Sequence, residues 1–175
     1  MDNTNTSNEP DPNTLDAINT DSATGGPGSS SAAPDAAQLL ALAIERFSTD
    51  IHAWLELIAE DAVVEFPYSR GLGTAARLEG RPAIAGYFTS AIQAFRDLTF
   101  RDVRLHPGRD PSFAVAEAHG TAIIAPTGRR YEQDYVMVVR ARGGRIVEYR
   151  EYWNPLPAIE AFGGAAAVAA TRFGS

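Results

Sequence analysis

The sequence of 175 residues contains no cysteine and no lysine, because all 15 of its basic residues are arginine. Without cysteine the chain cannot form a disulfide, a thiolate nucleophile or a cysteine-bound metal site. Without lysine it has neither a Schiff-base residue nor an anchor for a pyridoxal cofactor. It also lacks the Gly-Lys pair of a nucleotide-binding P-loop. These absences exclude thiol chemistry, covalent amine chemistry and P-loop nucleotide hydrolysis.

The chain also lacks a basic stripe and a long apolar run. Its net charge is −7, but five of the 22 acidic residues lie within the first 34 residues, which contain no arginine. The remaining 17 acidic residues are nearly balanced by the 15 arginines, so the rest of the chain is close to neutral. A neutral body does not favour nucleic-acid binding. No run is long enough to span a membrane, and the N-terminal segment does not resemble a secretory signal. We therefore expect a cytoplasmic protein without a nucleic-acid or membrane partner.

Composition divides the chain into three parts. Residues 1–34 are rich in Asn, Thr, Ser, Asp, Gly and Pro, which bury too little apolar surface to offset the entropy of ordering, so we expect a disordered tail. Residues 35–164 contain the apolar patterns of one folded domain. Residues 165–175 are rich in Ala and Gly, and we expect this C-terminal tail to fray.

The first half of the domain contains three apolar patterns with helical spacing. Asp35 and Gln38 form a capping box at the start of the first helix. Asp50 caps a second helix, which we expect to end near Asp61. Pro82 suits the first turn of the third helix. Three helices are therefore expected on one side of the domain.

The second half of the domain is predicted to be a sheet. Gly143-Gly144 is a good two-residue hairpin turn, and Pro67 places an earlier strand at an edge or a bend. The expected strands cover residues 62–68, 98–105, 113–125, 130–142 and 145–153. Helices followed by an antiparallel meander indicate an α+β fold in which a curved sheet wraps around the three helices. Such a sheet leaves a pocket on its concave side and a convex side that needs water or a partner subunit.

The last strand, which follows the Gly143-Gly144 turn, carries the strongest candidate for chemistry. Strict alternation puts Val147, Tyr149, Glu151 and Trp153 on one face, and Ile146, Glu148, Arg150 and Tyr152 on the other. Burial among aromatic side chains would raise the pKa of Glu151 toward neutrality, as a general acid or base requires. The alternative is that Glu151 forms a plain ion pair with an arginine such as Arg140 or Arg150.

Other polar and aromatic residues qualify as site candidates. His119 could shuttle a proton or polarise a carbonyl, or it could instead be exposed and pair with Glu117 on a dimer face. Tyr135 could donate a hydrogen bond to an oxyanion, although aromatic packing is the commoner role. The residues expected to contact substrate or to pack beneath it are Tyr149, Trp153, Tyr68, Phe66, Trp54 and Tyr131. The three histidines have no metal-binding spacing, so we expect no metal.

Four stretches in order resemble a known family: V-V-E-F-P, L-E-G-R-P-A-I, Y-E-Q-D-Y-V-M-V and G-G-R-I-V-E-Y-R-E-Y-W-N-P. Together they are similar to the SnoaL-like branch of the nuclear transport factor 2-like superfamily, which includes polyketide cyclases, ketosteroid isomerase and PhzA/PhzB-type proteins. The resemblance runs from about Asp35 to Gly164. It implies a cone-shaped, strongly bent antiparallel sheet closed by three helices, and a homodimer formed through the outer face of the sheet.

The resemblance also implies a role for Glu151. In SnoaL-like cyclases the acid/base carboxylate is an aspartate at this place in the last strand, and the PhzA/PhzB type has a functional glutamate there. It implies a cofactor-independent isomerase, cyclase or dehydratase acting on a hydrophobic carbonyl compound. Glu151 would move the proton, and Tyr135 or His119 would stabilise the oxyanion. The alternative is a non-catalytic module of the same fold that binds a small ligand or dimerises.

Overall fold

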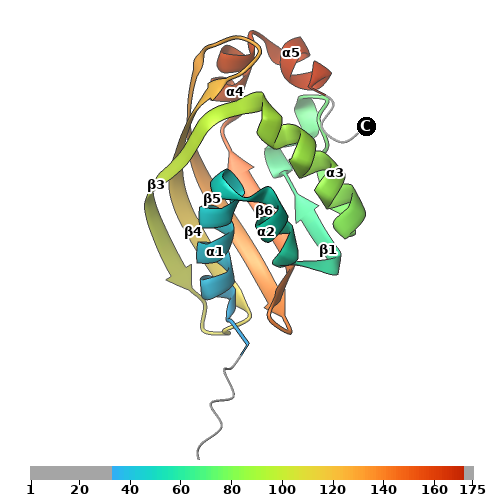
Figure 1. Cartoon of the computed structure of the whole chain (residues 1–175), viewed down its shortest axis with the longest axis vertical. Coiled ribbons are helices and arrows are strands. Elements are labelled where there is room, and N and C mark those ends of the chain that lie inside the picture. Colours follow the sequence, from blue (N-terminus) through green and yellow to red (C-terminus); the bar gives the residue numbers. More distant parts are fainter. Residues whose placement is uncertain (1–32, 172–175) are drawn as a thin grey trace, which may run out of the picture. The chain divides into compact units, whose positions relative to one another are not determined.

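The computed structural model describes residues 33–171. The predicted disordered tail therefore lies outside the described residues except for its last two. Six strands form one curved sheet in the order β2-β1-β6-β5-β4-β3 (Figure 1). The strands are β1 (Ile58–Glu65), β2 (Arg77–Glu79), β3 (Phe95–Pro107), β4 (Phe113–Ile124), β5 (Arg130–Arg142) and β6 (Arg145–Trp153). The predicted bounds of the last two strands are confirmed, and the α+β class is confirmed with them.

One strand pair departs from the antiparallel expectation. Strands β3 to β6 form the predicted antiparallel meander, but β1 pairs in parallel with β6. The chain between β1 and β6 contains a helix and four further strands, so no tight hairpin imposes an antiparallel pairing on them. The parallel pair begins where the Ile146 amide donates a hydrogen bond to the Leu57 carbonyl, at 2.8 Å. β1 therefore starts earlier than predicted.

A bulge in β6 changes the predicted faces of that strand. Arg140 of β5 pairs with Glu148, but the next residue, Ala141, pairs with Ile146, so Val147 is the extra residue of the bulge. Ile146 consequently points into the core and is fully buried, whereas strict alternation had placed it on the outer face. Beyond the bulge the predicted faces hold, and Glu151 faces the concave side of the sheet.

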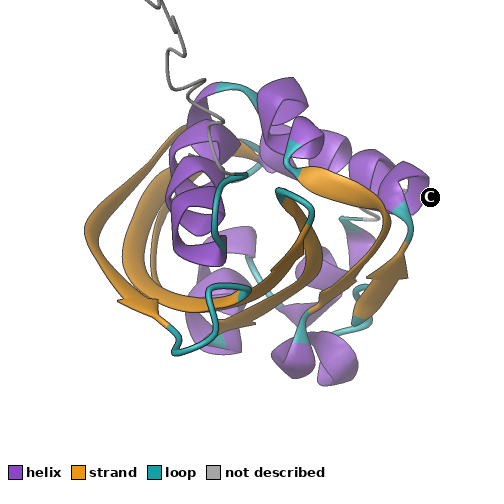
Figure 2. Cartoon of the chain, turned by 90° about the horizontal axis from the view of Figure 1, so that it is seen from below, coloured by secondary structure: helices purple, strands orange, loops and turns teal. Residues whose placement is uncertain are grey.

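Helices cover the concave side of the sheet, and Figure 2 shows the strands bending in an arc around them. α1 (Ala36–Thr49) begins at the predicted capping box, in which Asp35 Oδ1 accepts the Gln38 amide at 2.8 Å. α2 (Ile51–Glu56) is shorter than predicted, because the chain enters β1 at Ile58. α3 (Arg81–Ala91) has its proline in the first turn, as expected. Short 3-10 turns follow β1 and α3, at η1 (Pro67–Gly71) and η2 (Ile92–Ala94).

Two further helices complete the described chain. α4 (Pro155–Phe162) follows β6 and is capped by Asn154. The tail was predicted to fray from residue 165, but residues Ala165–Ala170 form α5, and its Val168 is buried against the core. That contact explains why an Ala-rich segment is ordered here. None of the helices within residues 33–171 is long and apolar enough to span a membrane.

The inner face of β4 lets the helices approach closely. Its inward residues from 114 to 122 are all small, namely Ala114, Ala116, Ala118, Gly120 and Ala122, and Ile124 ends the row. Larger side chains fill the space opposite them, from α1, β3 and β5.

Candidate active site

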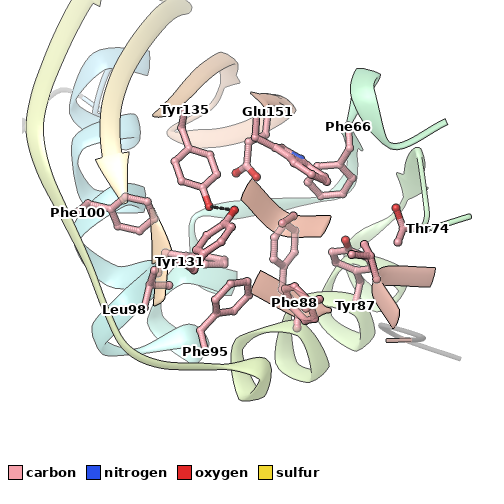
Figure 3. Close-up of a pocket in the computed structure, with 16 residues that line it drawn as sticks. Phe66, Thr74, Tyr87, Phe88, Phe95, Leu98, Phe100, Tyr131, Tyr135 and Glu151 are labelled. Atoms are coloured by element: carbon pink, nitrogen blue, oxygen red, sulfur yellow. Dashed lines mark hydrogen bonds between the residues drawn. The ribbon is translucent and has the colours of Figure 1, made fainter. Parts of the chain in front are cut away.

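The cavity lies on the concave side of the sheet and is lined mainly by aromatic side chains (Figure 3). Its volume is about 90 Å³. Ten of the sixteen lining residues are aromatic, and none is an arginine or a histidine. They are Phe47, Phe66, Thr74, Tyr87, Phe88, Ala91, Phe95, Leu98, Phe100, Tyr131, Tyr135, Glu151, Trp153, Ala158, Phe162 and Val168. Among these described residues, the only carboxyl group belongs to Glu151.

Glu151 sits on β6 with its carboxyl group pointing into the cavity (Figure 3). Burial raises the pKa of Glu151 to about 7, and the hydrogen bond from Tyr149 opposes this rise. That bond runs from Tyr149 Oη to Glu151 Oε2 at 2.9 Å. At neutral pH the carboxyl group is therefore close to half ionised and can both accept and return a proton.

The alternative of a plain ion pair for Glu151 is wrong. Among the described residues no arginine or histidine forms an ion pair with it. Arg150 instead binds Glu65 of β1 at 2.9 Å, on the outer face of the sheet. Arg140 lies near Glu148, at 3.6 Å. Arg150, the charged neighbour of Glu151 in the sequence, thus points away from the cavity, as alternation requires.

Tyr131 and Tyr135 supply a pair of hydroxyl groups beside the carboxyl group. Both face inward from β5, and their Oη atoms lie 2.9 Å apart (Figure 3). Burial raises the pKa of Tyr131 to about 12, against the effect of its hydrogen bonds, and raises that of Tyr135 well above its ordinary value. Both hydroxyls are therefore protonated at neutral pH. One donates to the other, so the accepting hydroxyl keeps its own proton for a ligand oxygen.

The space for the Tyr135 ring depends on a glycine. Gly120 lies beside it on β4, and a Cβ at this position would come within 2.8 Å of Tyr135 Cε2 and 3.2 Å of Phe100 Cε1. Real Cβ atoms do not approach other atoms so closely, so a side chain here would displace the tyrosine ring. The small inner face of β4 thus positions a candidate site residue.

The neighbouring residue in the same strand, His119, does not join the site. Ala118 and Gly120 point inward, so His119 points outward, and its Nδ1 lies 2.7 Å from Asp134 Oδ1. The prediction that His119 could stabilise an oxyanion in this cavity is therefore wrong. The alternative partner Glu117 is also not used, because it lies near Arg104 and His106 instead.

The predicted substrate-contacting residues divide into three groups. Phe66, Trp153 and Tyr131 line the cavity. Trp54 and Tyr149 lie behind it, with ring centroids 6.1 Å apart, and so hold the Glu151 hydrogen-bond donor in place rather than contact a ligand. Tyr68 lies outside the cavity. Its side chain is 54% exposed, and its ring packs against Tyr152.

Two polar residues of the cavity were missed at the sequence level. Tyr87 of α3 has its pKa raised by burial and, secondarily, by the charge of Glu151, so its hydroxyl lies near the carboxyl group. Helical periodicity marks Tyr87 only as apolar packing. Thr74 lies in the Gly-containing loop before β2, where no periodic pattern indicates a direction. Residues 33–171 contain no cluster of three His, Asp or Glu side chains that could hold a metal ion.

The SnoaL-like domain family matches residues 38–149 of this sequence. The chain belongs to the SnoaL-like domain family. Of its relatives, an uncharacterized PhzA/B-like protein of Pseudomonas aeruginosa is 37% identical over 120 residues, which cover 69% of this chain and 84% of the relative. The uncharacterized protein YesE of Bacillus subtilis is 39% identical over 115 residues, covering 66% of this chain and 78% of YesE.

Solved structures confirm the nuclear transport factor 2-like fold of this SnoaL-like domain. A Bacillus subtilis protein described as a candidate isomerase is 37% identical and has a TM-score of 0.67, covering 72% of this chain and 91% of that one. A candidate polyketide cyclase from Pseudomonas putida is 21% identical, with a TM-score of 0.62 and coverage of 73% and 97%. At this identity the second comparison shows the fold alone.

Proposed function

We propose that this SnoaL-like domain is a cofactor-independent enzyme that moves a proton next to the carbonyl group of a small apolar molecule. The reaction would be of the isomerase, cyclase or dehydratase type. One observation carries the proposal: Glu151 is a partly buried carboxyl group without a cationic partner among the described residues, with a pKa of about 7, in a cavity that also contains a tyrosine hydroxyl pair. A carboxylate base and hydrogen-bond donors for an oxyanion are what enolate chemistry needs, as in the known case of ketosteroid isomerase. A pKa near 7 suits a base that works at neutral pH.

In this mechanism ionised Glu151 removes a proton from the carbon next to the substrate carbonyl. The electron pair of that C–H bond moves into an enolate, and its oxygen accepts a hydrogen bond from Tyr131 or Tyr135. Protonated Glu151 then returns the proton. If the proton returns to a different carbon, the substrate is isomerised. If the proton goes instead to a hydroxyl group of the substrate, that group leaves as water and the substrate is dehydrated. Tyr149 keeps the carboxyl group oriented through the bond at 2.9 Å.

The test is the exchange of α-hydrogens of cyclohexanone into deuterated water, followed by NMR. We expect wild-type protein to accelerate exchange, and Glu151→Gln to slow the protein-dependent rate by about 10²- to 10⁴-fold, the range of general base catalysis. Glu148→Gln is the matched control, because Glu148 is exposed on the outer face of the same strand. The mechanism is refuted if Glu151→Gln exchanges as fast as wild type.

A second candidate function is the binding of a small organic cation without catalysis. The cavity offers ten aromatic rings and one carboxyl group, and aromatic faces together with a negative charge attract ammonium groups. Titration with trimethylammonium separates the two functions. A cation-binding module binds it more tightly as pH rises through about 7, where Glu151 ionises, and does not accelerate exchange.

A further inference from the structure

Thr74 carries a buried hydroxyl group that the proposed mechanism does not use. Its Oγ1 has no hydrogen-bond partner among the described residues, and the residue lines the cavity. Most buried hydroxyls in proteins are hydrogen-bonded, so an unpartnered one facing a cavity is a candidate ligand contact.

The loop that carries Thr74 is held against the cavity by α5. Gly73 has a φ of 73°, which favours glycine, and a Cβ at this position would come within 3.2 Å of Ala169 Cβ. The preceding residue of α5, Val168, lines the cavity together with Thr74. The loop and the helix therefore approach each other closely beside the cavity that Thr74 lines.

Thr74 and the tyrosine pair lie on different sides of the cavity. Figure 3 shows Tyr135 and Tyr131 on one side and Thr74 on the other, with Phe66 and Tyr87 on the Thr74 side. The cavity thus has hydrogen-bonding groups on both sides and aromatic walls between them. A ligand that bound only at the tyrosine pair would leave the Thr74 hydroxyl buried without a partner, at a cost in binding free energy.

Charge and size restrict the ligand further. Within residues 33–171 no cationic side chain lines the cavity, so a carboxylate or phosphate group would face ionised Glu151 without compensation. The cavity volume of about 90 Å³ is far below the roughly 300 Å³ at which pockets for drug-sized ligands begin. A polycyclic substrate does not fit this volume, whereas a compound of about one small ring matches its scale.

We propose that the substrate is a compact, uncharged carbonyl compound with a second hydrogen-bonding group, and that the Thr74 hydroxyl binds this second group. The assignment of a carbonyl group to the ligand rests on the proposed function. The assignment of a second hydrogen-bonding group rests on Thr74, and the test below can refute it without refuting the proposed function.

The test compares two ligands that differ by one hydroxyl group across the ring from the carbonyl: cyclohexanone and 4-hydroxycyclohexanone. Dissociation constants are measured by NMR titration of the full chain. We expect wild-type protein to bind the hydroxylated ring about five- to ten-fold more tightly, the effect of one net hydrogen bond. Thr74→Val keeps the shape and removes the hydroxyl, so the two constants should become equal, whereas Thr74→Ser should retain the preference.

Ser69 provides a matched control on the preceding 3-10 turn. Its Oγ is also buried without a partner among the described residues, but Ser69 does not line the cavity, so Ser69→Ala should keep the wild-type preference. Cyclohexanecarboxylate should bind at least ten-fold more weakly than cyclohexanone at pH 8, where Glu151 is ionised.

Several outcomes overturn this proposal. They are an unchanged preference in Thr74→Val, no preference in wild type, no binding of either ketone, or tighter binding of the carboxylate. The Glu151→Gln exchange test reports on the proposed function separately. If Thr74→Val loses the preference while Glu151→Gln still exchanges, the ligand class stands and the catalytic role fails. If Thr74→Val keeps the preference while Glu151→Gln loses exchange, the catalytic role of Glu151 stands and Thr74 is not part of the site.

Discussion

Replacing Glu151 with glutamine should change how the stability of this protein depends on pH. The pKa of Glu151 is raised from 4.5 to about 7, first because burial disfavours the ionised form. In the unfolded chain the same group ionises near its ordinary value. Between these two values the folded protein holds a proton that the unfolded chain has released, so folding becomes less favourable as pH rises.

The magnitude follows from the size of the pKa shift. Each pKa unit corresponds to about 1.4 kcal/mol, so a shift from 4.5 to about 7 gives a loss of about 3 kcal/mol in the free energy of unfolding. This value is an upper limit, because Glu151 is only partly buried and solvent screens its ionised form. The contribution of Glu151 is fully present below about pH 4.5 and is lost once pH exceeds about 7. The Glu151→Gln variant has no ionisable group at this position, so its free energy of unfolding should lack this pH-dependent contribution.

The assay is urea unfolding of wild type and Glu151→Gln at fixed protein concentration between pH 4.5 and 8.5. The quantity to follow is the difference in unfolding free energy between the two proteins at each pH. Other carboxylates cancel in this difference. They include Glu65, whose pKa is lowered mainly by a hydrogen bond from Arg150. We expect the variant to gain up to about 3 kcal/mol relative to wild type across the range.

A difference that stays constant with pH would show that Glu151 titrates normally and would remove the physical basis of the proposed mechanism. Tyr149→Phe sharpens the test. The Tyr149 hydrogen bond lowers the pKa of Glu151. Loss of this bond in Tyr149→Phe should therefore extend the pH-dependent loss of unfolding free energy to above pH 7.

Three further predictions concern the packing, the helices and the assembly. Gly120→Ala should lower the free energy of unfolding by about 1–3 kcal/mol and slow cyclohexanone exchange, because the added methyl group displaces Tyr135; denaturant unfolding and the exchange assay check both effects. Asp50→Ala should lower the free energy of unfolding by about 1 kcal/mol, because Asp50 Oδ1 accepts the first amides of α2, and an unchanged denaturation midpoint would contradict this. We propose that the chain forms a homodimer through the outer face of the sheet, where Val136 is 38% exposed. Val136→Arg should then halve the mass measured by light scattering, and a wild-type monomer would contradict the proposal.

Much of this protein could be predicted from local patterns. The start of α1 could be predicted from the capping box at Asp35, and the hairpin between β5 and β6 from the glycine turn at residues 143–144. These signals depend on residues that lie close together in the chain. Alternation in the last strand also placed Glu151 and Trp153 on one face, and both line the cavity. The order of helices and strands predicted the α+β fold, and the structure confirms it.

Local patterns failed where distant segments decide the geometry. Two features depend on contacts between segments far apart in the chain. They are the parallel pairing of β1 with β6 and the formation of helix α5. His119 was assigned to the site because its chemistry suits it, but the pleat of β4 turns it outward once Ala118 and Gly120 pack inward. No sequence pattern indicated that loop residue Thr74 would reach the cavity.

The sequence by itself determined which strand carries the candidate acid, and its lack of lysine and cysteine restricted the chemistry to carboxyl and hydroxyl groups and imidazole. Only the tertiary structure decided that neither Arg140 nor Arg150 pairs with Glu151, because the partners of these two arginines come from the outer face of the sheet. It also decided that rings from helices and strands enclose the carboxyl group, and this enclosure raises its pKa to about 7. The identity of a proton-transfer residue is a local property, whereas its pKa depends on every element packed around it.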